Sequence, residues 1–215
     1  MKKFNHVGSE LQDLRTENIN GKRHYVTPNG SYISITTLLA NLSKDSISRW
    51  RERVGAEEAN RISTKASRQG TAVHSLCERY IKNEQDFLAE SMPHLVEMFE
   101  SIQPLLDRID NVHVTEGALY SDDLQLAGRT DLIAEFDGKL AIIDYKTSRR
   151  IKTWEMCASY FMQGAFYAHA YEERTGIPIN NIVIIMAVEN EEPLLFRETK
   201  ERWLNPLKEV QYKYM

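Results

Sequence analysis

Cysteine is scarce in this sequence, and long apolar runs are absent. Only Cys77 and Cys157 occur among its 215 residues. Two cysteines cannot build a disulfide framework or a four-cysteine metal cluster within one chain, so the sequence fits a reducing compartment. No apolar run approaches the roughly 18 residues that a membrane span needs. We therefore expect a protein with no membrane partner.

Targeting segments and linkers are lacking as well. The first residues, MKKFNHVGSELQDLRTEN, contain no apolar signal core, and they include acids that a transit peptide would avoid. We therefore expect a cytoplasmic protein, from a bacterial or phage-infected cell rather than an organelle. Without a repeat, a low-complexity tract or a Pro/Gly/Ser-rich linker, residues 1–215 are expected to form one domain.

The net charge gives no general attraction to a polyanion. Acids outnumber Lys and Arg by 31 to 27, a formal charge of -4, whereas proteins steered by phosphate charge are usually basic. Basic side chains are nevertheless concentrated between Lys44 and Arg68, where seven of them occur beside four acids. This segment is either a solvated helix face or a face that contacts phosphates, and the sequence leaves both open.

Helical patterns dominate the first half of the chain. The stretch KRHYVTPNGSYISI predicts a short β-ribbon that turns at Pro28-Asn29-Gly30. Helices are expected over residues 34–43, 45–54 (ending at Gly55), 56–83 and 92–109. The third of these is either one long helix or two helices joined near Gly70.

After Asp110 the apolar pattern changes to period two. It predicts strands over residues 111–121, 126–136 and 139–147, then a helix over 153–176. A buried strand over 181–189, a weaker strand over 194–199 and a terminal helix over 200–215, interrupted at Pro206, complete the chain. This order predicts an α/β fold with a mixed central sheet and flanking helices.

Two carboxylates are expected to meet across the hairpin of residues 126–147. Asp137-Gly138 between apolar segments is typical of a two-residue type I′ turn, so Phe136 pairs with Lys139 and opposed residue numbers sum to 275. Asp131 then lies opposite Asp144, with Cβ atoms about 5 Å apart. Period two places Lys146 on the same face, with Arg129 opposite it.

Two acids forced together in a mostly apolar hairpin either share a proton or bind a cation. The alternative is a surface charge cluster, which the apolar neighbours of the two acids disfavour. Oxygen ligands of this kind suit Mg²⁺ or Mn²⁺, and a nearby lysine can orient a water or stabilise charge on a phosphoryl group. Since no Ser/His/Asp or Cys/His arrangement is present, the residues favour metal-dependent phosphodiester hydrolysis over acyl transfer.

With these residues in place, the chain resembles the PD-(D/E)XK nuclease superfamily. Within it the likeness is to RecB-type and phage exonucleases, nearest to the mitochondrial genome maintenance exonuclease group. The resemblance covers roughly residues 25–171. The ordered motifs that carry it are RQGTAVH, TEGALY, GRTDLIAEF, IDYKTS and QGAFY.

The resemblance implies a role for each matching residue. Asp131 and Asp144 look like metal ligands, Lys146 like the catalytic lysine, and the main-chain carbonyl of Tyr145 like a further ligand to one or two Mg²⁺ or Mn²⁺ ions. Glu116 matches an acid that supports the metal and acts in catalysis, and His74 matches a histidine that joins the metal site. The cysteines that hold an iron-sulfur cluster in some relatives are missing, so we expect no such cluster.

DNA contacts are expected from two further groups of residues. Gln163 and Tyr167 match a Q-x-x-x-Y element, and at i and i+4 they share one helix face. Arg61, Lys65 and Arg68 precede His74 by one or more helical turns and could hold phosphates on the approach to the site.

The implied fold is a restriction-endonuclease-like αβββαβ core preceded by a helical N-terminal region. Residues 1–110 would carry His74, residues 111–190 the catalytic core, and residues 191–215 a C-terminal strand and helix. The implied activity is that of a DNA exonuclease acting on single strands or free ends, in replication, recombination or repair. Two alternatives remain: a structure-specific or restriction-type endonuclease with the same site, and a non-catalytic DNA-binding accessory subunit.

Overall fold

A mixed sheet of eight strands organises the computed structural model, which describes residues 2–8 and 11–215. The strand order is β1-β2-β3-β5-β6-β7-β8, and β4 pairs with β5 outside this path. The strands are β1 (Thr16–Ile19), β2 (Lys22–Thr27), β3 (Gly30–Ser34), β4 (Ile109–Ser121), β5 (Leu126–Phe136), β6 (Lys139–Ser148), β7 (Asn181–Val188) and β8 (Leu194–Thr199). Pairing is parallel for β3 with β5 and for β6 with β7, and antiparallel elsewhere.

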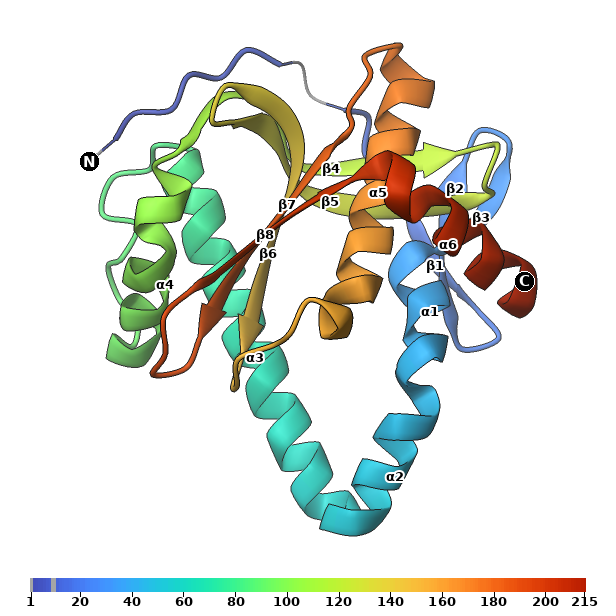
Figure 1. The fold of residues 1–215 in the computed structure, drawn as a ribbon, viewed down its shortest axis with the longest axis horizontal. Coiled ribbons are helices and arrows are strands. Elements are labelled where there is room, and N and C mark those ends of the chain that lie inside the picture. Colours follow the sequence, from blue (N-terminus) through green and yellow to red (C-terminus); the bar gives the residue numbers. More distant parts are fainter. Residues whose placement is uncertain (1, 9–10) are drawn as a thin grey trace.

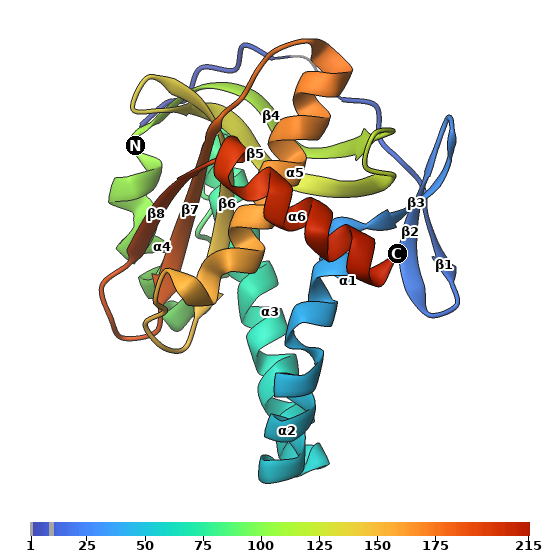
Figure 2. The ribbon, with the colours of Figure 1, turned by 45° about the vertical axis from the view of Figure 1, so that its right-hand side comes forward.

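Helices cover both faces of the sheet (Figures 1 and 2). They are α1 (Ile35–Leu39), α2 (Lys44–Val54), α3 (Ala56–Ile81), α4 (Pro93–Leu106), α5 (Ala158–Thr175) and α6 (Lys200–Tyr214), with short 3₁₀ turns at Ala40–Ser43 and Glu155–Cys157. The expected fold is confirmed, since β4, β5 and β6 precede α5 and β7 in the predicted αβββαβ order. None of the helices in the described residues is long and apolar enough to cross a membrane.

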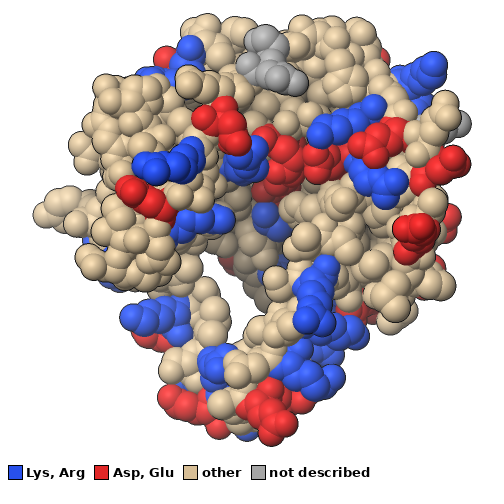
Figure 3. Space-filling view, turned by 180° about the vertical axis from the view of Figure 1, so that it is seen from behind, with Lys and Arg blue, Asp and Glu red and all other residues tan. Residues whose placement is uncertain are grey.

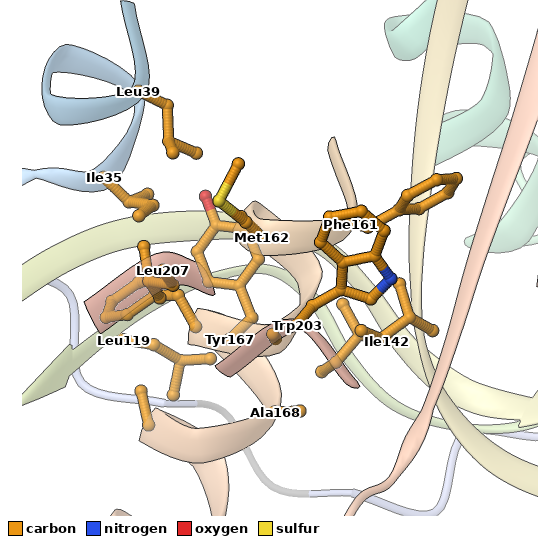
Figure 4. Close-up of a cluster of buried hydrophobic side chains, with 14 of the residues drawn as sticks. Ile35, Leu39, Leu119, Ile142, Phe161, Met162, Tyr167, Ala168, Trp203 and Leu207 are labelled. Carbon is orange, nitrogen blue, oxygen red and sulfur yellow. The ribbon is translucent and has the colours of Figure 1, made fainter. Parts of the chain in front are cut away.

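Period-two alternation along the strands divides the core into two clusters. Ile133, Ile142 and Ile184 point toward α1, α5 and α6, where they pack with the side chains shown in Figure 4. The intervening residues, such as Leu132 and Ile143, point toward α3 and α4. Each face of the sheet is therefore buried, which explains why β6 and β7 read as nearly continuous apolar runs.

The β5–β6 hairpin forms in the expected register over its turn-proximal half. Asp137 and Gly138 have φ values of 50° and 74°, as a type I′ turn requires. The pairs run from Phe136–Lys139 to Leu132–Ile143, which confirms the predicted register for five pairs. The Asp137 carboxylate also accepts hydrogen bonds from Arg108, so this aspartate has a structural role at the turn.

Beyond Leu132 and Ile143 the two strands part. β6 continues beside β7, from Asp144–Ile184 to Ser148–Val188. β5 stays paired with β4 and meets β3 only at Leu126 and Ala127. The edge of β5 that faces β6 is therefore unpaired over residues 128–131, and this opening lies at the centre of the sheet.

α2 and α3 project from the sheet as a two-helix arm (Figures 1 and 2). α3 is one continuous helix of 26 residues, about 39 Å long at 1.5 Å per residue, which settles the question left open at Gly70. Gly55 joins the two helices at φ 85°, a conformation that favours glycine, and α2 ends there as expected.

Two elements differ from the prediction. The polar strand β1 was not expected; it pairs with β2 at the edge of the sheet. α6 continues through Pro206, where an interruption was expected. Although proline removes one hydrogen bond, Trp203 and Leu207 lie four residues apart on the buried face of α6, and their packing holds the helix together.

Candidate active site

Asp131 lies where β5 and β6 part. Its Oδ2 atom accepts a hydrogen bond of 2.9 Å from the main-chain nitrogen of Tyr145, which follows Ile143, the last paired residue of β6 in the hairpin, by two positions. The side chain of one strand thus bonds the backbone of the other and holds the carboxylate next to Asp144. The prediction that Arg129 lies opposite Lys146 is wrong, because the ladder has ended; Arg129 instead donates to the Glu116 carbonyl and to Asp13.

Asp144 and Lys146 form a buried ion pair on β6. Asp144 is 3% exposed, and Lys146 Nζ lies 2.6 Å from its Oδ2 atom. Burial raises the pKa of the Asp144 carboxyl to about 6, because desolvation outweighs the opposing effect of the Lys146 ammonium and Asp131 adds a like charge. Burial acts to lower the pKa of Lys146, but the charges of Asp144 and Asp131 outweigh it and raise that pKa overall. Lys146 is therefore a cation at neutral pH.

A chain of polar contacts extends from Lys146 into α5. Lys146 Nζ lies 3.5 Å from Gln163 Oε1, and Gln163 Nε2 donates to Tyr167 Oη at 3.2 Å. The expectation that these two α5 residues share one face is thus confirmed. Tyr167 is 1% exposed and packs against β5 so closely that a Cβ atom at Gly128 would lie 3.0 Å from its hydroxyl. Gly128 therefore makes room for the tyrosine that orients Gln163.

His74 and Glu116 approach Asp131 from a different direction. They line an open hollow of about 480 Å³ together with Gly70, Thr71, Ser75, Glu78 and Asp131. His74 Nδ1 lies 3.4 Å from Asp131 Oδ2. The structure thus brings both predicted residues to the same carboxylate.

Glu116 occupies a strained position opposite Asp131. It lies between the β4–β5 pairs Thr115–Leu132 and Gly117–Thr130, and its φ is 51°, in the left-handed region. Burial, together with the charges of Asp131 and Glu78, raises the pKa of its carboxyl to about 7. Arg129 and Lys82 act in the opposite direction but do not offset this effect, so a bound cation would stabilise the ionised Glu116 carboxylate.

The donor set of this site suits a divalent cation. The buried Asp144 Oδ2 atom has no well-oriented hydrogen-bond donor, despite its short contact with Lys146, and Asp131 lies close enough to raise the pKa values of both Asp144 and Glu116. Carboxylate oxygens are the preferred ligands of Mg²⁺ and Mn²⁺. In the described part of the chain, however, no three His, Cys, Asp or Glu side chains already stand in a metal-holding arrangement. The ligand role of the Tyr145 carbonyl stays a prediction.

The predicted DNA-contacting cations lie elsewhere on α3. Arg61 and Lys65 line a small hollow with Arg149 and Glu189, at the ends of β6 and β7, instead of the hollow that contains His74. Arg61 is ion-paired with Glu58. Arg68 is exposed on the same helix. Figure 3 shows Lys and Arg side chains along the arm, beside an opening between the arm and the rest of the molecule.

Tyr160 is a site neighbour that the sequence did not indicate. Its ring lies 5.1 Å from Lys146 Nζ and 4.9 Å from Lys152 Nζ, and its hydroxyl accepts a hydrogen bond from Lys152. Tyr160 precedes Gln163 by three residues, so it lies on the same face of α5. That spacing is the signal that could have identified it.

Comparison with known proteins identifies two similar exonucleases. Mitochondrial genome maintenance exonuclease 1 of Mus musculus is 29% identical over 110 residues, and that of Homo sapiens is 30% identical over 112 residues. Each match covers 49% of this chain but only 32% of the relative, so the chain spans about a third of the curated relatives it matches. Their mitochondrial names contrast with the expectation of a bacterial or phage-infected cell.

Among solved structures, a candidate exonuclease from Eubacterium rectale matches with a TM-score of 0.45 and 13% identity, over 68% of this chain and 69% of that one. The family described as the PD-(D/E)XK nuclease superfamily matches residues 44–193. That match covers more than half of the chain and includes Asp131, Asp144 and Lys146. The chain therefore belongs to the PD-(D/E)XK nuclease superfamily.

Proposed function

We propose that this protein is a divalent-metal-dependent DNA exonuclease that hydrolyses phosphodiester bonds on single strands or free ends. The observation that carries the proposal is the convergence of Asp131, Asp144 and Lys146 where β5 and β6 part. Two carboxylates and a protonated amine lie together there, and one of the carboxylates, that of Asp131, lines the open hollow.

In this proposal Lys146 is the catalytic cation. Asp144 fixes its position and raises its pKa, so the amine stays charged and can orient the attacking water or stabilise charge that develops on the phosphoryl oxygens. Gln163, held by Tyr167, lies beside the same amine and can position the DNA backbone. Because Tyr167 is buried, it can hold the Gln163 side chain in one orientation.

Asp131, Asp144, Glu116 and His74, with the Tyr145 carbonyl, would hold one or two Mg²⁺ or Mn²⁺ ions. When bound, such an ion would lower the pKa of a water molecule and offset negative charge on the phosphoryl group. The crowded acids themselves support this assignment, because burial and like charge raise the pKa values of Asp144 and Glu116.

Support for DNA ends as the substrate comes from the two relatives, which are named as genome maintenance exonucleases. Since the match spans 32% of each of them, their activity is extended to this chain only as part of the proposal. The words genome maintenance in the same names support our extending the proposal to a role in DNA replication, recombination or repair.

The proposal is tested with linear and circular DNA of the same sequence. The protein should release nucleotides from linear single-stranded DNA with Mg²⁺ or Mn²⁺, and EDTA should stop the release. Circular single-stranded DNA should stay intact. Cleavage of the circle would instead indicate an endonuclease, and DNA binding without metal-dependent cleavage of either substrate would indicate an accessory subunit.

A further inference from the structure

A second groove lies between the two-helix arm and the segment that follows β6. Its volume is about 600 Å³. Trp50 and Arg53 of α2 line one side, Ile62 of α3 adjoins them, and residues 148–152 with Met156 line the other side. The groove thus joins segments that are a hundred residues apart in sequence.

Positive charge dominates the polar lining of this groove. Arg53, Arg149, Arg150 and Lys152 line it, and no acid does. Among the residues that the structure describes, Arg53, Arg150 and Lys152 have no carboxylate within 4.0 Å, and Arg149 reaches only Glu189, at 3.9 Å. Four cations with so little internal neutralisation fit a polyanionic ligand.

The apolar lining favours a single strand over a duplex. Trp50 contributes a large aromatic ring, and Ile151 and Met156 are 56% and 59% exposed. A duplex presents its phosphates outward and keeps its bases stacked inside, so this apolar surface would gain nothing from it. An extended single strand offers both phosphates for the cations and base faces for the indole.

The groove begins close to the candidate active site. Ser148, at its edge, follows Lys146 by two residues on β6, about 7 Å along the strand. Tyr160 lies between the two regions, with Lys146 and the groove residue Lys152 both over its ring. A strand lying in the groove would therefore lead directly to the Asp144–Lys146 pair.

We propose that this groove binds a single-stranded segment of the substrate, with phosphates at Arg53, Arg150 and Lys152 and a base stacked on Trp50. This inference rests on the proposed nuclease function and names the part of the substrate that the protein holds outside the reacting bond. Trp50 and these cations are positioning residues, since none of them contacts the catalytic pair directly.

Binding of a fluorescein-labelled oligothymidylate, measured by anisotropy in EDTA, tests the charge component without cleavage. Arg53→Ala/Arg150→Ala should weaken binding on the order of tenfold and reduce the slope of log affinity against log salt by about 1.4, because each phosphate contact on a single strand contributes about 0.7. The matched control Lys22→Ala/Lys139→Ala removes two exposed lysines on other turns and should bind as the wild type does.

Trp50 is tested by its fluorescence as well as by affinity. Trp50→Ala should weaken binding of the oligothymidylate by roughly tenfold, whereas Trp50→Phe should keep most of the affinity. Binding should quench the wild-type tryptophan fluorescence, and Trp50→Phe should lose this quenching while remaining folded. A blunt duplex of equal length should bind more weakly than the single strand and should not distinguish wild type from Trp50→Ala.

Wild-type affinity, salt slope and quenching in the groove variants would overturn the inference. That outcome is separate from failure of the proposed function, because binding is measured without metal. If Lys146→Ala abolishes cleavage but the groove variants bind normally, the nuclease function stands and the groove proposal falls. If the protein cleaves neither substrate but the groove variants lose binding, the groove binds single-stranded DNA and the proposed nuclease function falls.

Discussion

Asp131 Oδ2 accepts the main-chain N–H of Tyr145 at 2.9 Å, so a side chain of β5 bonds the backbone of β6 where their ladder ends. This contact places one carboxylate beside the buried Asp144 without a continuing strand pair between them. The separation of the two carboxylates can therefore change when a cation binds between them, since no ladder hydrogen bond fixes it.

Metal binding should depend on these two acids. We expect isothermal titration with Mn²⁺ to show binding to the wild type, and Asp131→Asn or Asp144→Asn to weaken it by at least about tenfold, because each removes a charged ligand. Asp137→Asn is the matched control, since Asp137 belongs to the other Asp-x-Lys sequence and serves the turn. Equal Mn²⁺ affinity in all four proteins would exclude the assigned ligands.

Alanine substitutions at Gly128 and Gly70 should have different effects on the stability of the fold. A Cβ atom at Gly128 would lie 2.8 Å from Ile35 and 3.0 Å from Tyr167, so Gly128→Ala should lower the free energy of unfolding by about 1–3 kcal/mol. At Gly70, inside α3, the nearest atom is Thr147 Oγ1 at 3.4 Å. Gly70→Ala should be neutral or stabilising by up to about 1 kcal/mol. Urea denaturation measures both, and the opposite order would show that the packing around Gly128 is wrong.

Asp137, at the β5–β6 turn, should make the free energy of unfolding depend on pH. A hydrogen bond from Arg108, with a further contribution from Arg197, lowers the pKa of the Asp137 carboxyl to about 2. A lowered folded-state pKa stabilises the fold above the unfolded pKa of about 4, and the effect is lost as pH falls toward 2.

Asp137→Asn keeps a residue that tolerates positive φ but removes this charge. Wild type should therefore exceed the variant in unfolding free energy at pH 6, by no more than about 1 kcal/mol for so exposed a pair, and the difference should vanish near pH 2. Thermal unfolding across this range measures it; a constant difference would assign the effect to the turn geometry instead.

The sequence predicted the local geometry of the hairpin but not its end. Asp137-Gly138 fixes the register through local φ preferences, and the five observed pairs follow it. Where β5 leaves β6 depends on tertiary competition, because β6 continues beside β7 while β5 follows β4. That is why Arg129 does not lie opposite Lys146, and why Asp131 and Asp144 are close neighbours without forming the opposed ladder pair that was expected.

Helix periodicity predicts which residues share a helix face, but a shared face does not by itself bring those residues to the active site. Gln163 and Tyr167 were expected on one face of α5 and are hydrogen-bonded there. Arg61 and Lys65 also share a face, but they precede His74 on the same helix by spacings that put them on nearly the opposite side of α3, where they meet Arg149. The groove at Trp50 could not be predicted, because it exists only where the arm faces residues a hundred positions later.

The two Asp-x-Lys sequences allow the most direct test of the catalytic assignment. Cleavage of end-labelled single-stranded DNA with Mg²⁺ is measured for wild type, Lys146→Ala and the control Lys139→Ala, whose lysine is exposed at the β5–β6 turn. We expect Lys146→Ala to lower the rate by about 10²- to 10³-fold, through loss of a positioned cation, and Lys139→Ala to retain the wild-type rate. Equal cleavage by wild type and Lys146→Ala would contradict the account.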